Sequence, residues 1–312
     1  MKPDKISRRI HKGPFIKHCP CSPGAVSCGY FNLNLHTGCP YDCTYCILQD
    51  YLENKSRPVF YTNFGDLETE LQEFSQSRTH VRIGTGELSD SLAFEGKIAA
   101  AARILALAEK FPEIVFEFKT KSDRVGPILA ARGPLKNIVV SWSLNPQSVV
   151  EREERKTPGL KARLEALAAV QGKGISVGIH FDPLLIFPGW KAQYVNLVRE
   201  INRTLDPSRV AWWSLGALRF PPSLKRHIFK HPQSMLFAGE LVPGFDGKCR
   251  YYKPLRRELF DYVRRKIASL VSAEIPVYLC MEEDEMWREI LPSMPTDEKR
   301  LNRLLYDSVM GK

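Results

Sequence analysis

The sequence predicts an α/β fold in which helices cover a parallel sheet. Continuous apolar, β-branched runs alternate with helical patterns through residues 30–216, and this alternation is typical of parallel sheets whose two faces are covered. The chain has 312 residues, enough for an α/β barrel of about 250 residues with an extension, or for two domains of about 150 residues each.

Six strands and five helices are expected in alternation. The strands are expected at Tyr30–His36, His80–Thr85, Ile114–Thr120, Asn137–Ser143, Ile175–Phe181 and Arg209–Leu215. The helices are expected at Asp66–Ser75, Phe94–Phe111, Asp123–Ala131, Gly159–Gly172 and Trp190–Thr204. These units fit a partial or complete barrel, or an open doubly wound sheet, and their order does not separate the three.

The pattern changes at two points, which divide the chain into three parts. Residues 1–29 form a basic lead-in that contains cysteines, and residues 30–216 hold the alternating units. Residues 217–312 form a basic α/β C-terminal extension, with a helix expected at Leu255–Ser272, a short strand at Pro276–Cys280 and charged helices after it.

The charge and composition of the chain indicate which partner it binds and in which cell compartment it works. The chain carries a net charge of +10, which favours a polyanionic partner such as DNA or RNA. It shows no apolar stretch of about 18 residues that could span a membrane and no signal-peptide pattern. We therefore expect a cytoplasmic protein whose eight cysteines are metal ligands or reactive thiols rather than disulfides.

The strongest motif is the C-x₃-C-x₂-C spacing of Cys39, Cys43 and Cys46, which follows the first strand. A [4Fe–4S] cluster has four irons that each need an outer ligand. Three thiolates leave one iron open for a substrate. The alternative is a zinc site completed by His36, although zinc favours two separated C-x₂-C pairs.

The cysteine motif, with Tyr45 before the last cysteine, resembles the radical S-adenosylmethionine (SAM) superfamily. The segments Cys46–Gln49, Ser89–Leu92, Phe118–Lys121, Ser143–Asn145 and Gly189–Trp190 resemble, in the same order, the spore photoproduct lyase branch. The resemblance implies a partial (β/α)6 barrel, a [4Fe–4S] cluster and reductive cleavage of SAM to a 5′-deoxyadenosyl radical. It also implies an electron donor such as a flavodoxin or a ferredoxin.

Residues at the expected strand ends are candidates for SAM binding. Glycines allow a close backbone approach, and the resemblance places the Gly84–Glu87 segment at the amino-acid end of SAM. The cofactor-binding candidates are Gly86, Glu87, Ser89, Lys121, Ser143, Asn145 and Asp182. The plain structural alternative is a solvated side chain for Lys121, and a turn or its capping contacts for the Gly84–Glu87 segment, Ser143, Asn145 and Asp182.

Basic and aromatic residues in the extension are candidates for substrate binding. Arg219, Lys248, Arg250 and Tyr251 combine charges for phosphates with a ring for a stacked base. The alternative is a solvated basic face.

Cys19, Cys21 and Cys28 form a second group that a strand over Tyr30–His36 would separate from Cys39 by about 20 Å. We expect structural thiols there, with a second metal site or a redox pair as the alternatives.

Two positions depart from the resembled branch. That branch uses a cysteine just before the Ser-Asp pair to return a hydrogen atom to the product, and Glu87 or Leu88 stands there. It also has a tyrosine directly after the third cluster cysteine, where Ile47 stands. The cofactor chemistry is therefore expected, while the substrate and the catalytic hydrogen donor stay open. The rival class is a non-catalytic, metal-bound nucleic-acid-binding protein.

Overall fold

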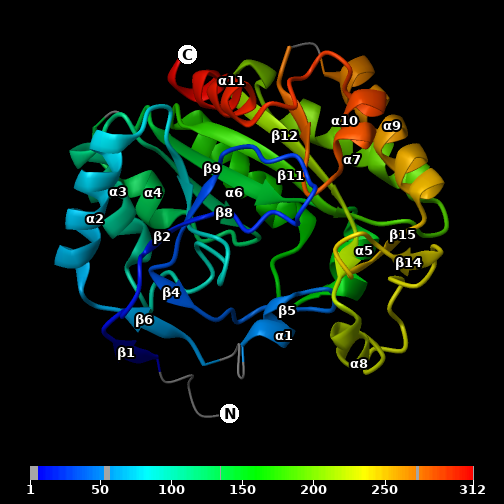
Figure 1. Ribbon diagram of the computed structural model, residues 1–312, viewed down its shortest axis with the longest axis horizontal. Coiled ribbons are helices and arrows are strands. Elements are labelled where there is room, and N and C mark those ends of the chain that lie inside the picture. The colour runs from blue at the N-terminus through cyan, green and yellow to red at the C-terminus, as the bar shows by residue number, and fades with distance from the viewer. Residues whose placement is uncertain (1–5, 53–56, 134, 272–273, 312) are drawn as a thin grey trace.

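The computed structural model describes residues 6–52, 57–133, 135–271 and 274–311, and its core is an open, curled sheet of eight strands (Figure 1). The order is β16 (Val277–Leu279), β12 (Val210–Ala217), β11 (Ser176–Leu184), β9 (Ile138–Ser143), β8 (Val115–Thr120), β7 (Arg82–Gly84), β3 (Phe31–Leu33) and β2 (Ile16–His18). All neighbours are parallel except β2 and β3. The expected partial barrel is confirmed, with all six expected strands in the sheet.

Amphipathic helices pack against this sheet. They are α2 (Phe64–Ser77), α3 (Ala100–Lys110), α4 (Gly126–Ala130), α6 (Leu160–Gly172), α7 (Trp190–Thr204), α9 (Lys253–Leu270) and α11 (Glu298–Met310). In α3 the buried residues Ala101, Ile104, Leu105 and Ala108 repeat at the spacing of one helix face. The structure describes α9 to Leu270, and Ser272, the expected last residue of that helix, lies outside the described residues.

Several features differ from the predicted elements. The helix expected at Phe94–Phe111 begins only at Ala100, because residues 94–99 form turns. The first strand ends at Leu33, because His36 and Thr37 leave the sheet as β4 (His36–Thr37) and pair with β6 (Val59–Tyr61). The strand at Val277–Leu279 joins the barrel sheet beside β12 instead of packing separately on it. Helix α5 (Gln147–Glu153) was not predicted, and it ends next to the two-residue strand β10 (Glu154–Arg155).

Short elements surround the barrel mouth and the lead-in. Among the described residues they are β1 (Ser7–Arg9), β5 (Asp42–Cys43), β13 (Arg219–Phe220), β14 (Leu241–Pro243), β15 (Cys249–Tyr251), α1 (Leu48–Tyr51), α8 (Lys225–Ile228) and α10 (Asp284–Ile290). Single 3₁₀ turns lie at Pro207–Arg209 and Pro222–Leu224. None of the helices described here combines the length and the apolar character needed to cross a membrane.

Candidate active site at the carboxyl ends of the strands

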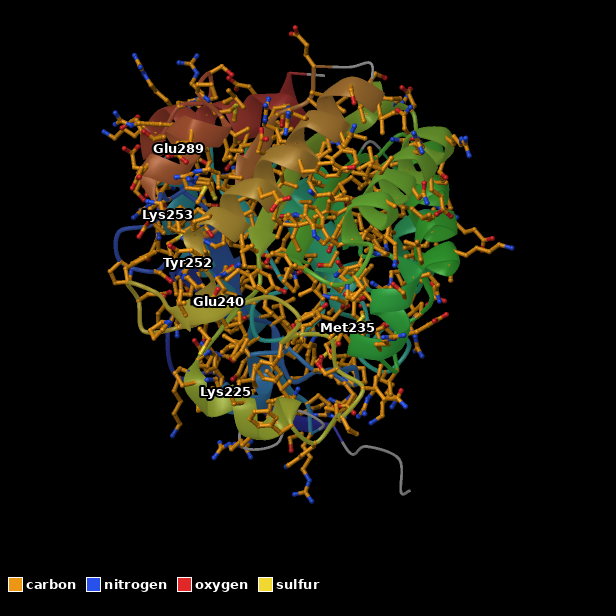
Figure 2. The ribbon with its side chains drawn as sticks, turned by 90° about the vertical axis from the view of Figure 1, so that its right-hand side faces the viewer. Lys225, Met235, Glu240, Tyr252, Lys253 and Glu289 are labelled. Carbon is orange, nitrogen blue, oxygen red and sulfur yellow. The ribbon has the colours of Figure 1, made fainter. Side chains whose placement is uncertain are left out.

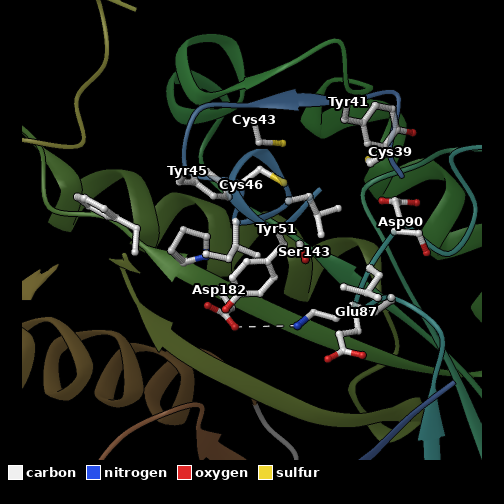
Figure 3. Close-up of a pocket in the computed structure, with 18 of the residues that line it drawn as sticks. Cys39, Tyr41, Cys43, Tyr45, Cys46, Tyr51, Glu87, Asp90, Ser143 and Asp182 are labelled. Carbon is white, nitrogen blue, oxygen red and sulfur yellow. Dashed lines mark ion pairs between the residues drawn. The ribbon is translucent and has the colours of Figure 1, made fainter. Parts of the chain in front are cut away.

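A cavity of about 350 Å³ lies where the parallel strands end, and the cysteine loop forms one of its walls (Figure 3). Binding sites in curled parallel sheets form at this edge. The cavity brings together predicted residues from seven segments of the chain: Cys39, Cys43, Cys46, Gly86, Glu87, Ser89, Lys121, Ser143, Asp182, Arg219 and Lys248. Asn145, Arg250 and Tyr251 are not among its lining residues.

Hydrogen bonds to two other loops hold the cysteine loop in place. Cys43 pairs in an antiparallel ladder with Glu154, and the Gly38 N–H donates to the Leu88 carbonyl at 2.9 Å. The Cys39 and Cys43 thiols are buried and unpaired. Burial raises the pKa of Cys39 above its usual range and that of Cys43 to about 12. These thiols therefore stay protonated until a metal displaces their protons.

A buried ion pair lies directly behind the cysteine loop. Arg163 Nη1 is 2.5 Å from Glu154 Oε2, and neither side chain is exposed. The Tyr45 hydroxyl and the Asn145 amide also donate to Glu154. Burial alone would raise the pKa of Glu154, but Arg163 and Lys121 hold it below its usual range. Glu154 thus carries a negative charge that fixes the loop from within the protein.

Lys121 lies between this carboxylate and the cysteines. Its ammonium is 5.6 Å from the centre of the Tyr45 ring. Burial would lower the pKa of Lys121, but Glu154 and Cys43 raise it above its usual value. Lys121 is therefore a half-buried cation on the cavity wall, close enough to Cys43 to offset negative charge on its thiolate. Lys119 reaches the other side of the cavity, where its ammonium is 4.0 Å from Asp182.

The loop after β7 approaches strand β8 closely. A Cβ on Gly86 would lie 2.9 Å from the Lys119 carbonyl oxygen, so a larger residue would push the loop away. Glu87 accepts a hydrogen bond from Asn34 Nδ2 at 2.8 Å. The loop is anchored by Asp90, which accepts from the Thr120 hydroxyl at 2.6 Å and from the Lys121 N–H at 2.7 Å.

Asp182 lies on the wall opposite the cysteines and is held by Arg219. The Asp182 and Arg219 side chains are 3.1 Å apart. Burial alone would raise the pKa of Asp182, but Arg219 and Lys119 hold it well below its usual range. Strand β11 continues through Asp182 to Leu184, two residues beyond the cis Asp182–Pro183 peptide bond. The strand expected at Ile175–Phe181 was therefore ended three residues too early.

Three predicted residues serve the scaffold instead of lining the cavity. Asn145 is fully buried, donating to Glu154 at 2.9 Å and accepting from the Tyr194 hydroxyl at 2.9 Å. Arg250 is 1% exposed and is paired with Asp246 and Glu282. Tyr251 is buried, and its hydroxyl accepts from the Ile186 N–H at 3.0 Å.

The second cysteine group lies near the Arg219 side of the cavity. Pro20, between Cys19 and Cys21, lines the cavity, as does Met281, which follows Cys280. The Cys280 thiol lies 3.7 Å from Arg219 Nη2. A hydrogen bond from Cys19, together with the charges of His18 and Arg219, lowers the pKa of Cys21 to about 7 despite burial.

The two departures from the resembled motif are visible in the cavity wall. Glu87, Leu88 and Ile47 all line the cavity, and the cysteines among its described lining residues are Cys39, Cys43 and Cys46. Among the described residues, Cys19 and Cys21 adjoin the lining residue Pro20, Cys280 adjoins Met281, and Cys249 adjoins Lys248 and pairs with Phe220.

His36, the proposed fourth zinc ligand, is buried with its ring 6.0 Å from the Phe94 ring, and it is not among the lining residues. Burial lowers its pKa to about 4. No cluster of His, Cys, Asp and Glu in the described ranges stands close enough to hold a single metal ion. A [4Fe–4S] cluster takes one thiolate for each of three irons, so its ligands stand further apart than those of zinc.

Sequence reasoning missed several functional positions. Glu153, Glu154 and Arg163 support the loop, and Tyr41 and Tyr51 line the cavity. Glu153 and Glu154 stand in a run of six charged residues, 151–156, which in the sequence looks like a solvated face and gave no signal of this support.

Comparison with known proteins points to one family. The family model described as "Spore photoproduct lyase" matches residues 22–240. The spore photoproduct lyase of Clostridium acetobutylicum is 23% identical over 235 residues, which cover 75% of this chain and 66% of that protein. The one from Geobacillus sp. is 26% identical over 260 residues, 80% of this chain and 76% of that protein. The chain thus spans about two thirds to three quarters of these relatives.

Solved structures agree with the fold. A spore photoproduct lyase double mutant with bound AdoMet and dinucleoside spore photoproduct has a TM-score of 0.76 and 25% identity, covering 88% of this chain and 82% of that one. Streptococcus suis SuiB has a TM-score of 0.50 at 15% identity, and that likeness concerns the fold alone.

Proposed function

The chain belongs to the spore photoproduct lyase family, and from this membership we propose that it is a radical SAM enzyme that removes a hydrogen atom from a nucleic-acid substrate. Spore photoproduct lyases are radical SAM enzymes, so the predicted cofactors, a [4Fe–4S] cluster and SAM, are confirmed at the level of the family. The observation that carries the proposal is the cavity that joins three free thiols to SAM-binding candidates from four other segments.

The residues present fit both cofactors. Cys39, Cys43 and Cys46 open onto one cavity without disulfide partners, and Lys121 supplies a half-buried positive charge close to Cys43. Gly86 lets its loop lie close against strand β8, because a Cβ there would meet the Lys119 carbonyl oxygen, and the loop so brings Glu87 to the cavity wall. When bound, the cluster and SAM supply a 5′-deoxyadenosyl radical, which takes the hydrogen atom from the substrate.

The chain's own residues would orient SAM and exclude water. Glu87 is placed to hold the ammonium group of SAM, and Lys121 or Lys119 its carboxylate. Ser143 offers a hydroxyl for the ribose, and Asp182, kept ionised by Arg219, is a hydrogen-bond acceptor across the cavity. Leu48, Leu88 and Ile47 provide apolar walls that shield a reactive intermediate from solvent.

A DNA substrate is part of the proposal, because the related solved enzyme binds the dinucleoside spore photoproduct. Lys248 and Arg219 at the cavity edge are the basic residues that could meet a phosphate. A cytoplasmic location, inferred from the cysteine content, belongs to the same proposal.

The test is to offer the dinucleoside spore photoproduct to the reduced protein with SAM and to measure 5′-deoxyadenosine and repaired thymidine separately. We expect faster 5′-deoxyadenosine formation with little thymidine, because Glu87, Leu88 and Ile47 supply no thiol or phenol for the hydrogen return. No effect of this compound on SAM cleavage would contradict the proposed DNA substrate.

A further inference from the structure

We propose that α8 and the segment after it, residues 225–238 (the α8 surface), form the docking site for a small acidic protein that delivers single electrons to the cluster. The inference rests on the proposed function, because an electron is needed only if the three thiols hold a cluster. It assigns a partner to a surface outside the SAM cavity.

A single side chain, that of Glu153, connects the α8 surface to the cysteine loop. Glu153 is fully buried; its carboxylate accepts from the hydroxyl of Thr44, which lies between Cys43 and Cys46. The same carboxylate accepts from the Ser234 hydroxyl at 3.0 Å and from the Met235 N–H. Glu153 therefore links the cysteine loop directly to the segment after α8, which Figure 1 shows beside α5, β5 and α1.

Further contacts fix the α8 surface at both ends. His231 Nδ1 lies 2.6 Å from Arg155 Nη1, and Arg155 is paired with Asp42, the residue before Cys43. At the other end, Asp50 of α1 accepts from Ser223 at 2.8 Å and lies 3.6 Å from Arg226. These contacts fix the position of the α8 surface relative to the loop that carries the cluster ligands.

The centre of the α8 surface is apolar and exposed. Phe229 is 69% exposed and Phe237 is 39% exposed. Their rings are stacked, with centroids 5.1 Å apart and planes 18° apart. Phe237 also meets the edge of buried Phe220, which lines the cavity. Exposed apolar surface of this kind marks an interaction site.

The rim of the α8 surface is cationic. Lys225 and Lys230 are exposed and have no ion pair among the described residues. Figure 2, which faces this side of the molecule, labels Lys225 on α8 and Met235 in the following segment. The nearby carboxylates of Asp42 and Asp50 are already paired with Arg155 and Arg226. Glu151 of α5 and Glu240, two positions after residue 238, are exposed carboxylates outside the α8 surface.

An apolar centre with a cationic rim fits a weak encounter with an acidic carrier. Redox partners use small interfaces, and complementary charge raises their association rate. The carrier would pass one electron to the oxidised cluster, so that the carrier is oxidised by one electron and the cluster reduced by one. No bond forms or breaks. The Glu153–Thr44 contact gives this electron a short route from the surface to the loop.

The test measures the binding of a purified flavodoxin, an acidic one-electron carrier, to the reconstituted protein at several salt concentrations. The double variant Lys225→Glu/Lys230→Glu should raise Kd by about tenfold and flatten its dependence on salt. Phe229→Ala should raise Kd without changing that dependence. These side chains are exposed, so the variants should fold. The matched control, Lys299→Glu/Arg300→Glu on α11, reverses two exposed charges at the opposite end of the molecule in Figure 1 and should leave Kd unchanged.

A second measurement separates this inference from the proposed function. The rate of cluster reduction by flavodoxin should fall in the α8 variants, while reduction by photoreduced 5-deazaflavin, a small molecule, should not change. Unchanged flavodoxin binding and reduction in the α8 variants would overturn the docking site and leave the enzyme intact. Weaker binding of a single-stranded oligonucleotide, with flavodoxin binding unaffected, would assign the surface to nucleic acid and would also overturn the inference.

Discussion

Cys43 and Glu154 are paired backbone to backbone, and the Glu154 carboxylate turns inward to a fully buried ion pair with Arg163. A cluster ligand is thus attached to a charge that the protein interior holds in place. This explains how a short loop, whose regular structure is the two-residue strand β5, keeps three thiols at one cavity.

The first prediction concerns this pair. Glu154→Ala should lower the free energy of unfolding by about 3–5 kcal/mol, because Arg163 would remain buried without a counter-charge. It should also lower the iron content after reconstitution, because the cysteine loop would lose its support. Urea unfolding measures the first effect and iron analysis the second. Glu151→Ala, at an exposed position of α5, is the control and should change neither. Parent-like stability and iron content in Glu154→Ala would show that the pair does not support the loop.

The second prediction concerns the cluster ligands. Replacing Cys39, Cys43 or Cys46 by Ala should abolish the binding of about four iron and four sulfide per chain, because each thiolate serves a separate iron. Iron and sulfide analysis after anaerobic reconstitution measures this. Cys249→Ala, in buried strand β15, should keep the full content. Retention of the cluster in any of the three variants would mean that its ligands were misassigned.

The third prediction concerns pH and the barrel interior. Burial would raise the pKa of Glu117, but the hydrogen bond with His180 at 3.0 Å and that from Tyr30 lower it to about 2. A lowered folded-state pKa stabilises the protein above about pH 4.5, and this stabilisation is lost as the pH falls toward 2.

Glu117→Gln should therefore cost about 2–3 kcal/mol at pH 6 and progressively less below about pH 4.5. Unfolding free energies of parent and variant across this range provide the measurement. Glu113→Gln, exposed just before β8, is the control. A cost that does not change with pH would show that the charge of Glu117 contributes nothing.

The fourth prediction concerns the lead-in thiols. Because its pKa is lowered to about 7, Cys21 should react with iodoacetamide at half its maximal rate near pH 7. Cys19→Ser should change this midpoint, since the hydrogen bond from Cys19 is the largest influence on it. Peptide mapping by mass spectrometry gives the extent of reaction, with buried Cys249 as the unreactive reference. A Cys21 midpoint near 9 in the parent would contradict the contact with Cys19.

The sequence predicted what depends on local pattern. Continuous apolar runs predicted six strands that are all in the sheet. The spacing of Cys39, Cys43 and Cys46 predicted a shared site, and all three residues line one cavity. Residues whose role depends on distant partners were not predictable. In the sequence, Arg250 resembles a surface cation, but in the structure it is buried and paired with Asp246 and Glu282. Glu154 becomes important only because folding places it against Cys43, 111 positions earlier in the chain.

The pairing of the C-terminal extension with the barrel sheet was not predictable for the same reason. A three-residue strand at Val277–Leu279 carries too little pattern to reveal that it pairs with Trp213–Leu215 and completes the sheet. After the boundary predicted at residue 217, one strand of the extension thus joins the barrel sheet, while β13, β15 and β14 form a separate three-stranded sheet. Once the extension is folded back, Met281 reaches the cavity wall.

The central claim is that this cavity generates a radical from SAM, and SAM cleavage tests it most directly. Anaerobically reconstituted protein, reduced and given SAM alone, should form 5′-deoxyadenosine slowly, because the three thiols, the cavity and the SAM-binding candidates are all in place. Formation should stop in Cys43→Ala and continue in Cys249→Ala. Tight binding of one zinc, with no iron–sulfur cluster and no 5′-deoxyadenosine after reconstitution, would contradict the account.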